Sequence, residues 1–338
     1  MALPDTQQAI QLLRLPQGMP QATDFGLTRR PLPVPAGGEL LLRTHILSLD
    51  PYLRPLLAGR YVVPQPALGT IVPGMGLAQV VGGDDKTFVP GTWVVGETGW
   101  CEYAVARPAT LRRVDPALAP PSTALGVLGI PGLTAWAGMK RIAQPQAGET
   151  VLVSTAAGAV GSVVGQLAKA AGCRVVGITS SEAKQRIVVE EFGFDACVGY
   201  RSASFREDLR SACPDGIDIY FDNVGGAVLE AALSILRLRA RVVLCGLSDQ
   251  YNRSERPAGP NLGPVIGARA RMQGLVVYDH LQDFAQCQAE LAAMIGAGTL
   301  RYREELHVGL QQAPGAFIGL LRGDNLGKAL VQIGEALP

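Results

Sequence analysis

Residues 154–161 read STAAGAVG and carry no acidic, basic or aromatic side chain, although they stand between a strand-like and a helix-like segment. Small residues in such a turn let the backbone approach an anion closely, and the N-terminus of the following helix favours negative charge. The stretch therefore predicts a turn that holds the pyrophosphate of a dinucleotide, although a tight turn without a ligand would have the same composition. The residues of this predicted turn are Ala157, Gly158, Ala159, Val160 and Gly161.

The next strand ends in GITSSEAK, and this ending bears on which dinucleotide would bind. An NAD site usually has Asp or Glu here, which bonds the ribose 2′-hydroxyl. This chain has hydroxyl residues instead, and Lys184 follows in the first turn of a helix that Ser181 would cap. The helix dipole disfavours a cation there by about 0.3–1 kcal/mol. A bound 2′-phosphate would remove that conflict, so we expect NADP (NADPH) rather than NAD; a solvated lysine without a ligand is the alternative.

These segments need particular elements to bring them together. From about Thr150, apolar strands alternate with amphipathic helices, which is the pattern of a doubly wound parallel sheet. The earlier part of the chain has short β-like runs between Gly and Pro turns, as in an antiparallel, partly barrel-like domain. We expect an α/β protein with a Rossmann domain over residues 123–299. A β domain of residues 1–122, joined by the C-terminal residues 300–338, would bind the substrate.

Composition excludes several classes of function. The 338 residues have a net charge of +1, which gives no reason to expect a nucleic acid or an anionic membrane as partner. The six cysteines are far apart in the sequence and form no C-x-x-C pair, as expected for reduced thiols in a cytoplasmic protein. Residues Leu118–Met139 are uncharged, but prolines and glycines interrupt them. We interpret this stretch as a domain junction and expect no membrane span.

Six segments carry a resemblance to a known family, the zinc-independent medium-chain dehydrogenases/reductases: VSTAAGAVG with its following helix, YFDNVGG, VVLCGLSDQYN, GLVVYD, GDNLGKALV and LSLDPYLR. The branch that the chain resembles most contains prostaglandin and leukotriene reductases, plant double-bond reductases and bacterial NADPH-dependent enone or curcumin reductases. The resemblance extends over nearly the whole chain. It implies a GroES-like β domain, a Rossmann domain and an active site in the cleft between them. It also implies a homodimer formed by edge pairing of the Rossmann sheets.

The resemblance further implies cofactor contacts at the positions that match the family's motifs. Besides the phosphate turn, these are Lys184 and Tyr200 on the 2′-phosphate side, Asn223 in DNVGG, Cys245, Gly246, Leu247, Ser248 and Tyr251 beside the nicotinamide, Leu275, Val276 and Val277 in the strand whose backbone receives the carboxamide, and Asn325 in the tail. Each position also has an ordinary structural interpretation. Tyr200 could cap a strand, and Asn223 with two glycines could form a plain turn.

The wider superfamily contains zinc enzymes, so a zinc site is the first alternative to consider for this chain. A catalytic zinc needs a set of Cys, His and acidic ligands. The three histidines, His45, His280 and His307, do not stand in a Gly-His-Glu context, and the segment that would offer the first cysteine has Asp50 followed by proline and tyrosine. We therefore expect no metal. No Tyr-x-x-x-Lys pair and no G-x-S-x-G elbow is present either.

Without these acids, reduction of a conjugated double bond is easier than reduction of an isolated carbonyl. Hydride goes to the β-carbon of an α,β-unsaturated aldehyde or ketone, and neutral donors can stabilise the enolate that forms. Tyr52 in DPYLR matches a substrate-facing tyrosine of the family, and we expect it to be the catalytic donor, with the nicotinamide ribose hydroxyl as a second. A buried tyrosine with a structural role is the alternative.

One departure from the family pattern concerns Gly267, which stands where many members have a second active-site tyrosine. Tyr61 or Tyr251 could take its place, and the glycine could widen the pocket. We expect a reductase of 2-alkenals and enones that resembles the 15-oxoprostaglandin reductases and acts on small molecules. An NADPH quinone oxidoreductase and a non-catalytic NADPH-binding redox sensor remain alternatives.

Overall fold

The computed structural model describes residues 3–61, 63–255 and 257–334. The contacts within the chain divide it into two compact units. The first consists of Met1–Leu125 with Glu304–Pro338, and the second of Gly126–Arg303. The first and the last described segments of the chain therefore belong to the same unit.

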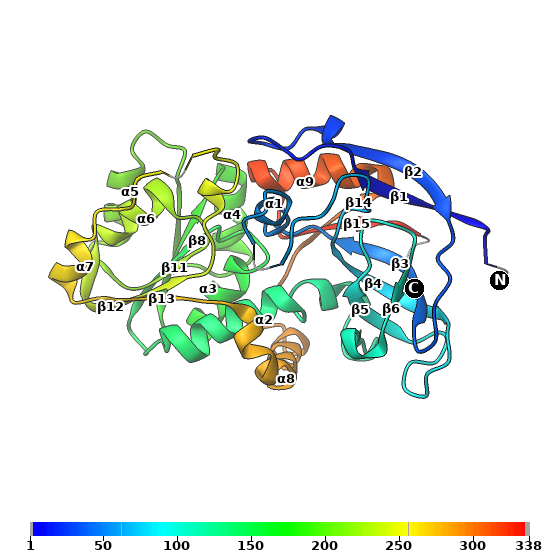
Figure 1. Cartoon of the computed structure of the whole chain (residues 1–338). Helices are drawn as coiled ribbons and strands as arrows, with labels where there is room; N and C mark the ends of the chain where they lie inside the picture. The colour runs from blue at the N-terminus through cyan, green and yellow to red at the C-terminus, as the bar shows by residue number, and fades with distance from the viewer. Residues whose placement is uncertain (1–2, 62, 256, 335–338) are drawn as a thin grey trace. The chain divides into compact units, whose positions relative to one another are not determined.

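A parallel sheet forms the centre of the second unit (Figure 1). Its strands lie in the order β10 (Ala196–Gly199), β9 (Arg174–Thr179), β8 (Thr150–Ser154), β11 (Ile217–Asp222), β12 (Leu236–Leu244) and β13 (Arg271–Gly274). Strand β8 is buried along its whole length, as expected for a strand covered on both faces. The chain reverses its direction of winding between β8 and β11, which is the point where such sheets bind dinucleotides.

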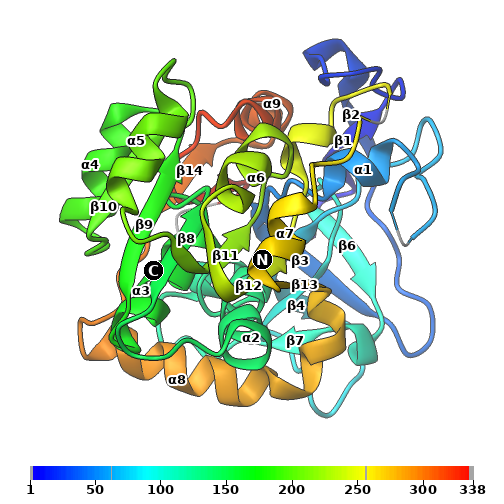
Figure 2. The same ribbon diagram turned by 90° about the vertical axis from the view of Figure 1, so that its left-hand side faces the viewer.

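Helices cover both faces of this sheet. They are α2 (Ile130–Ala137), α3 (Gly161–Ala170), α4 (Glu182–Glu190), α5 (Phe205–Ala212), α6 (Gly226–Leu233), α7 (Gly263–Ala268) and α8 (Phe284–Gly296), with shorter helical stretches at Gly138–Ala143 (η4), Ser248–Gln250 (η5) and Val277–Asp283 (η6). Figures 1 and 2 show α5 and α6 on one face and α2, α3 and α8 on the other. Phe205 of α5 and Leu229 of α6 pack with Leu152 of β8 in one buried cluster. The predicted Rossmann sheet is confirmed.

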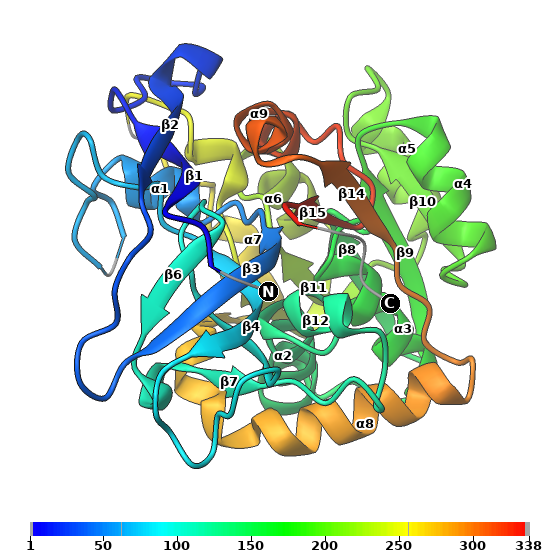
Figure 3. The same ribbon diagram turned by 90° about the vertical axis from the view of Figure 1, so that its right-hand side faces the viewer.

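The first unit is built mainly from antiparallel pairs (Figure 3). Its larger sheet has the order β14 (Glu304–Val308), β15 (Lys328–Gln332), β3 (Leu40–Ser48), β4 (Met75–Gly82), β5 (Trp93–Glu97) and β7 (Arg112–Arg113), with β6 (Tyr103–Ala106) paired to β3. A separate hairpin joins β1 (Thr6–Leu12) and β2 (Phe25–Pro31), and the helical elements are η1 (Ala22–Asp24), α1 (Leu53–Leu57), η2 (Pro108–Thr110), η3 (Pro121–Leu125), η7 (Leu310–Gln312) and α9 (Ala313–Arg322). The predicted α/β class with a separate β unit is confirmed.

Aromatic packing fixes the part of the first unit that carries α1. The ring of Trp100 stacks on Phe25 with centroids 5.7 Å apart and meets Phe317 of α9 edge-on at 5.8 Å. Leu53 and Leu57 of α1 are buried in the same apolar cluster. The apolar side chains of α1 therefore fix the position of the helix within this unit. They also restrict the turn that directly precedes it.

The uncharged stretch Leu118–Met139 forms short elements rather than one long helix. It contains η3, all of α2 and the beginning of η4, and the boundary between the two units falls after Leu125. Among the described residues, no helix combines the length and apolar character needed to cross a membrane.

Candidate functional site

The turn between β8 and α3 has a backbone that leaves little room for side chains. Thr155 opens it with a φ of 54°, which is strained for a β-branched residue. A Cβ on Gly161 would lie 2.3 Å from the carbonyl oxygen of Thr155, and a Cβ on Gly158 would lie 3.0 Å from its methyl group. The N–H of Ala156 donates to the carbonyl of Ile178 in β9 at 3.0 Å. The turn therefore lies close against the sheet and brings its backbone to the start of α3, where an anion is favoured. The other predicted contacts in this turn are Ala157, Ala159 and Val160.

The groups predicted to bind a 2′-phosphate meet at the carboxyl end of β9. Ser181 caps α4, because its hydroxyl accepts a hydrogen bond from the backbone N–H of Lys184 at 3.4 Å. The N–H of Tyr200 donates to the carbonyl of Thr179 at 3.0 Å, which brings β10 to the same edge. Tyr200 is 37% exposed, and the guanidinium of Arg201 lies 5.6 Å from its ring centroid. Two cations and an exposed ring thus flank one strand end, a donor set that suits a phosphate ester.

Asp222 ends β11 and is fully buried. Its Oδ1 accepts hydrogen bonds from the Tyr220 hydroxyl at 2.7 Å and from the N–H groups of Val224 and Gly225 at 3.0 Å. Burial raises the pKa of Asp222 and raises that of Tyr220 well above its ordinary value. The phenol therefore stays protonated and donates, so that the turn after β11 is anchored from inside the unit.

Asn223 links this turn to β8. Its Nδ2 donates to the carbonyl of Ser154 at 2.8 Å, and its backbone N–H donates to the Ser154 hydroxyl, also at 2.8 Å. The N–H groups of Cys245 and Gly246 donate to the carbonyl of Asp222 at 2.8 and 3.1 Å. The turns that follow β8, β11 and β12 are therefore joined to one another at the switch point of the sheet.

The loop Cys245–Tyr251 closes on itself. The N–H of Leu247 donates to the Tyr251 hydroxyl at 3.4 Å, and the N–H of Ser248 donates to the carbonyl of Asn223 at 3.4 Å. Burial raises the pKa of Tyr251, and it raises the pKa of Cys245 to about 12. Cys245 is thus a protonated thiol at neutral pH and no nucleophile. The loop can position a ligand through hydrogen bonds.

The expected strand GLVVYD is wrong in its position. Strand β13 ends at Gly274, because its partner β12 ends at the paired residue Leu244 and no neighbouring strand continues beyond it. Leu275 adds one more bond, from its N–H to the carbonyl of Leu244 at 2.9 Å, and Val276 keeps an extended backbone with φ −114° and ψ 112°. Val277 already begins η6. The three predicted carboxamide contacts therefore lie just beyond the strand.

Tyr52 lies in the first unit, directly before α1. Its ring stacks on Tyr61 with centroids 5.3 Å apart and an angle of 27°. The nearby Asp50 pairs with Lys328 of β15, whose Nζ lies 2.6 Å from Oδ1 and donates to the carbonyl of Leu49 at 2.8 Å. Lys328 is 4% exposed. The segments LSLDPYLR and GDNLGKALV, far apart in the sequence, are thus joined by a buried ion pair.

Asn325 belongs to the turn between α9 and β15 in the same unit. Its Nδ2 donates to the carbonyl of Gly327 at 2.9 Å, and the next residue, Leu326, donates its N–H to Glu305 at 2.8 Å. These bonds fix the turn that leads into Lys328.

Comparisons with known proteins bear on both units. Residues 8–114 match a family model described as the N-terminal domain of oxidoreductase, and residues 159–294 match one described as zinc-binding dehydrogenase. The NADPH-dependent curcumin reductase of Escherichia coli (strain K12) is 39% identical over 94% of each chain. The 2-alkenal reductase (NADP+-dependent) of Nicotiana tabacum is 40% identical over 89% of this chain and 90% of its own. The chain belongs to the medium-chain dehydrogenase/reductase family.

A solved structure agrees with this membership. CurA from Vibrio vulnificus, in complex with NADPH, is 40% identical and superposes with a TM-score of 0.92 over 97% of this chain and 100% of its own. The family resemblance inferred from the six sequence segments is therefore confirmed, as is its branch, the enone reductases among the medium-chain enzymes.

The zinc in the description of one family model calls for a set of metal ligands. Among the described residues, no group of three or more His, Cys, Asp or Glu side chains could hold a metal ion. His45 is buried in β3 with its ring 4.8 Å from that of Trp93, and His307 lies 3.1 Å from Glu305. The described part of this medium-chain reductase therefore does not assemble the donor set that zinc requires.

Sequence reasoning missed several residues that hold the turns of this medium-chain reductase in place. The sequence does contain a signal for two of them. Asp222 is an acidic residue at the end of an apolar strand, and Lys328, one of only five lysines, stands next to an apolar run. Arg201 follows Tyr200 directly, but nothing in the sequence shows that its guanidinium lies over that ring. Gly267, where the family tyrosine is missing, lies exposed on α7, and a Cβ there would meet no atom within 4 Å.

Proposed function

We propose that this protein is an NADPH-dependent reductase that transfers hydride to the C=C bond of α,β-unsaturated aldehydes and ketones. The observation that carries the proposal is that the turns after β8, β11 and β12 are joined at the switch point of the sheet, and that the turn after β8 leaves little room for a Cβ at Gly158 or Gly161. The curcumin reductase and 2-alkenal reductase named above support the substrate class, and the NADPH complex of CurA supports the cofactor.

The cofactor residues divide by the part of NADPH that they would bind. The turn from Ala157 to Gly161 holds the pyrophosphate, and Lys184, Tyr200 and Arg201 hold the 2′-phosphate. Asn223, the loop Cys245–Tyr251 and the residues Leu275–Val277 orient the nicotinamide ring, and Asn325 closes over the cofactor. When bound, NADPH supplies the hydride, while these residues supply position and exclude water.

Tyr52 supplies the hydrogen bond that the reaction needs. As the β-carbon of the substrate is reduced, negative charge develops on the carbonyl oxygen, and a phenol can donate to it without ionising. The stacked ring of Tyr61 and the turn anchored by Asp50 restrict the conformations of Tyr52. The first unit thus acts as the substrate and catalytic domain and the second as the NADP-binding domain.

The proposal is tested with purified protein and NADPH, using a medium-chain 2-alkenal, the corresponding saturated aldehyde and a benzoquinone in parallel. We expect turnover of the 2-alkenal to the saturated aldehyde and no turnover of the saturated aldehyde itself. A preference for the quinone would identify a quinone oxidoreductase instead. Tight NADPH binding without reduction of any of the three would identify a sensor.

We also propose a homodimer formed through β13. This strand is the outer strand of its sheet, and Arg271, Gln273 and Gly274 are exposed along it. An unpaired edge is a ready template for a second copy. Gln273→Pro, which removes a backbone donor from that edge, should convert a dimer into a monomer in light scattering; an unchanged mass would exclude this interface.

A cytoplasmic location is proposed as well. All six cysteines are free, and burial raises the pKa of Cys101 and Cys287 to about 12. Free, protonated thiols suit a reducing compartment. Fractionation of the source cells, with immunodetection of the protein, would test the location.

A further inference from the structure

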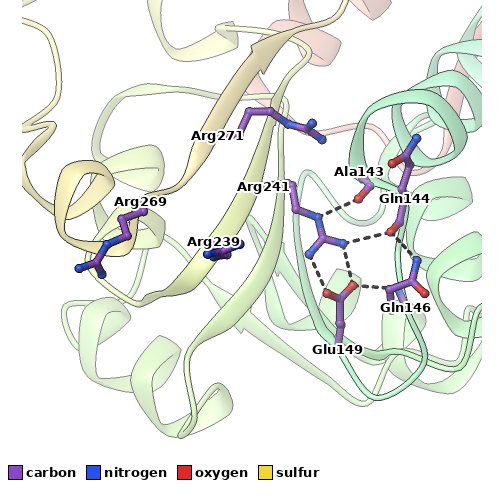
Figure 4. A pocket seen from close by; sticks show the side chains of 8 residues that line it. All are labelled: Ala143, Gln144, Gln146, Glu149, Arg239, Arg241, Arg269 and Arg271. Atoms are coloured by element: carbon purple, nitrogen blue, oxygen red, sulfur yellow. Dashed lines mark hydrogen bonds and ion pairs between the residues drawn. The ribbon is translucent and has the colours of Figure 1, made fainter.

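A basic pocket lies in the second unit, at the amino-terminal ends of the strands. The turns of the proposed cofactor site follow the carboxyl ends of the strands, on the opposite edge of the sheet. It has a volume of about 600 Å³ and opens beside the amino ends of β8 and β13 (Figure 4). The charged residues in its lining are Arg239, Arg241, Arg269, Arg271 and Glu149. Four guanidinium groups thus share one pocket with one carboxylate, in a chain whose net charge is only +1.

The one acidic residue of the lining, Glu149, is already paired with an arginine. Both terminal nitrogens of Arg241 lie 2.7 Å from the carboxylate of Glu149, and its Nε donates to the carbonyl of Ala143 at 2.9 Å. Figure 4 shows this guanidinium directed at Glu149. Arg271 donates one bond, from Nη2 to the carbonyl of Ile142 at 2.8 Å.

The remaining arginines have no counter-charge. Among the described residues, the side chains of Arg239 and Arg269 have no hydrogen-bond or ion-pair partner, and that of Arg271 has no acidic one. The one acid in the lining does not balance these positive charges, and a bound anion would be attracted to them.

The backbone around this pocket is unusual in a second, independent way. Within the described part of the chain, the non-glycine residues with left-handed backbone are Gln144, Thr155, Arg239 and Arg269. Three of these four line the pocket, and the fourth opens the phosphate turn. Strained backbone of this kind gathers at functional sites, because only surrounding structure or a ligand maintains it.

Both left-handed arginines stand where another residue would be easier to accommodate. Arg269 ends α7 with a φ of 50°, a position that usually has glycine or asparagine. Arg239, with a φ of 64°, lies in a bulge of β12, where the span Leu236–Arg241 faces only Ile217–Ile219 of β11. Bulges change the direction of a side chain next to functional sites.

We propose that this pocket binds a small polyanion with two or more phosphate groups and no nucleobase. A guanidinium fork matches two phosphate oxygens, and three arginines without acids exceed the charge of one phosphate. The volume lies within the range of ligand pockets, about 300–1,000 Å³. The lining contains no aromatic side chain on which a base could stack. An inorganic oligophosphate and a bisphosphorylated metabolite share this chemistry.

The test is calorimetric titration of tripolyphosphate into the full chain saturated with NADP+, at constant ionic strength. Saturation fills the proposed cofactor site, so that any remaining binding reports on a separate one. We expect one site per chain. Arg239→Gly and Arg269→Gly should each weaken binding at least tenfold while leaving the thermal midpoint equal or higher, because glycine relieves the left-handed backbone.

Arg206→Gln serves as the matched control. Arg206 is an exposed arginine of α5 that lies 3.6 Å from Glu230, outside the pocket, and its replacement should leave binding unchanged. Orthophosphate should bind far more weakly than tripolyphosphate, and fructose 1,6-bisphosphate against tripolyphosphate distinguishes a metabolite from an inorganic ligand. No saturable binding, or binding that neither glycine variant weakens, would overturn the proposal. So would a change in oligomeric mass in these variants without any tripolyphosphate binding, because a second copy would then occupy the pocket.

Discussion

At the scale of single residues, we propose Lys184 as the residue that makes the site prefer NADPH over NADH. It lies half-buried in the first turn of α4, where the helix dipole opposes its charge, and no acid takes the usual NAD position at the end of β9. Arg201 and the exposed ring of Tyr200 lie at the same edge. A bound phosphate would interact favourably with all three groups.

Replacing Lys184 with alanine should therefore weaken NADPH binding by about 10- to 150-fold, the loss of one charge-assisted hydrogen bond of about 1.5–3 kcal/mol. NADH binding should change little. Fluorescence titration with both cofactors measures the difference. Lys169→Ala is the control, because Lys169 lies on α3 and its Nζ is 2.9 Å from the carboxylate of Asp195. Equal losses for both cofactors would remove Lys184 from the 2′-phosphate site.

Tyr52 can be tested through its hydroxyl alone. Tyr52→Phe keeps the ring stacked on Tyr61 but removes the donor, so kcat/KM for a 2-alkenal should fall by about 1–3 kcal/mol, roughly 5- to 150-fold. Tyr61→Phe keeps the same stack and should retain nearly full activity. Steady-state kinetics of both variants decide the matter. Unchanged kinetics in the first variant would exclude Tyr52 as the donor, and an equal loss in the second would mean that the Tyr61 hydroxyl is needed as well.

At this scale, the sequence predicted those residues whose role depends only on their neighbours along the chain. The small residues of 154–161 and the cap at Ser181 can be recognised in the sequence, because turn and cap preferences depend on neighbours along the chain. The buried network of Asp222 and the contact of Arg201 with Tyr200 could not be predicted. Both depend on which strands lie side by side, and single-residue patterns do not contain that information.

At the scale of elements, the pair Lys328–Asp50 joins β15 to the turn before α1. Both partners are largely withdrawn from water, so removing one leaves the other charge buried without compensation. Lys328→Met should lower the free energy of unfolding by about 3–5 kcal/mol. The double variant with Asp50→Leu should recover much of that loss. Urea unfolding measures both; a loss below about 1 kcal/mol in the single variant would contradict the buried pair.

The alternation of strands and helices in the second unit followed from apolar periodicity, but the end of β13 did not. A β-branched run such as Val276–Val277 indicates a strand on its own. The strand nevertheless stops at Gly274, because β12 ends at Leu244 and offers no further partner. Element boundaries of this kind depend on the neighbouring strand, which the segment itself does not reveal.

At the scale of the whole molecule, several carboxyl groups of the two units have pKa values shifted in opposite directions. In the second unit the pKa values of Glu149, Asp195 and Glu290 are lowered. Burial alone would raise them, but hydrogen bonds to basic or N–H partners have the larger effect. Asp222 is an exception, with its pKa raised by burial. In the first unit burial raises the pKa of Glu97 and Glu304.

Groups with a lowered pKa stabilise the fold above their ordinary value, and this stabilisation is lost as the pH falls through the native pKa. Groups with a raised pKa stabilise it below their ordinary value. Acidification below 4.5, the ordinary glutamate value, should therefore weaken the second unit before the first. Hydrogen-exchange protection factors between pH 6 and pH 3 test this order. Earlier loss of protection in β3 and β4 than in β8 and β11 would contradict it.

The most direct measurement concerns the destination of the hydride. With NADPH deuterated on the transferable position of C4 and 2-hexenal as substrate, the product is isolated and the deuterium located by NMR. Conjugate reduction predicts deuterium on the β-carbon of hexanal. Deuterium on the carbonyl carbon of an alcohol, or recovery of 2-hexenal without deuterium while NADPH remains bound, would contradict the proposed function.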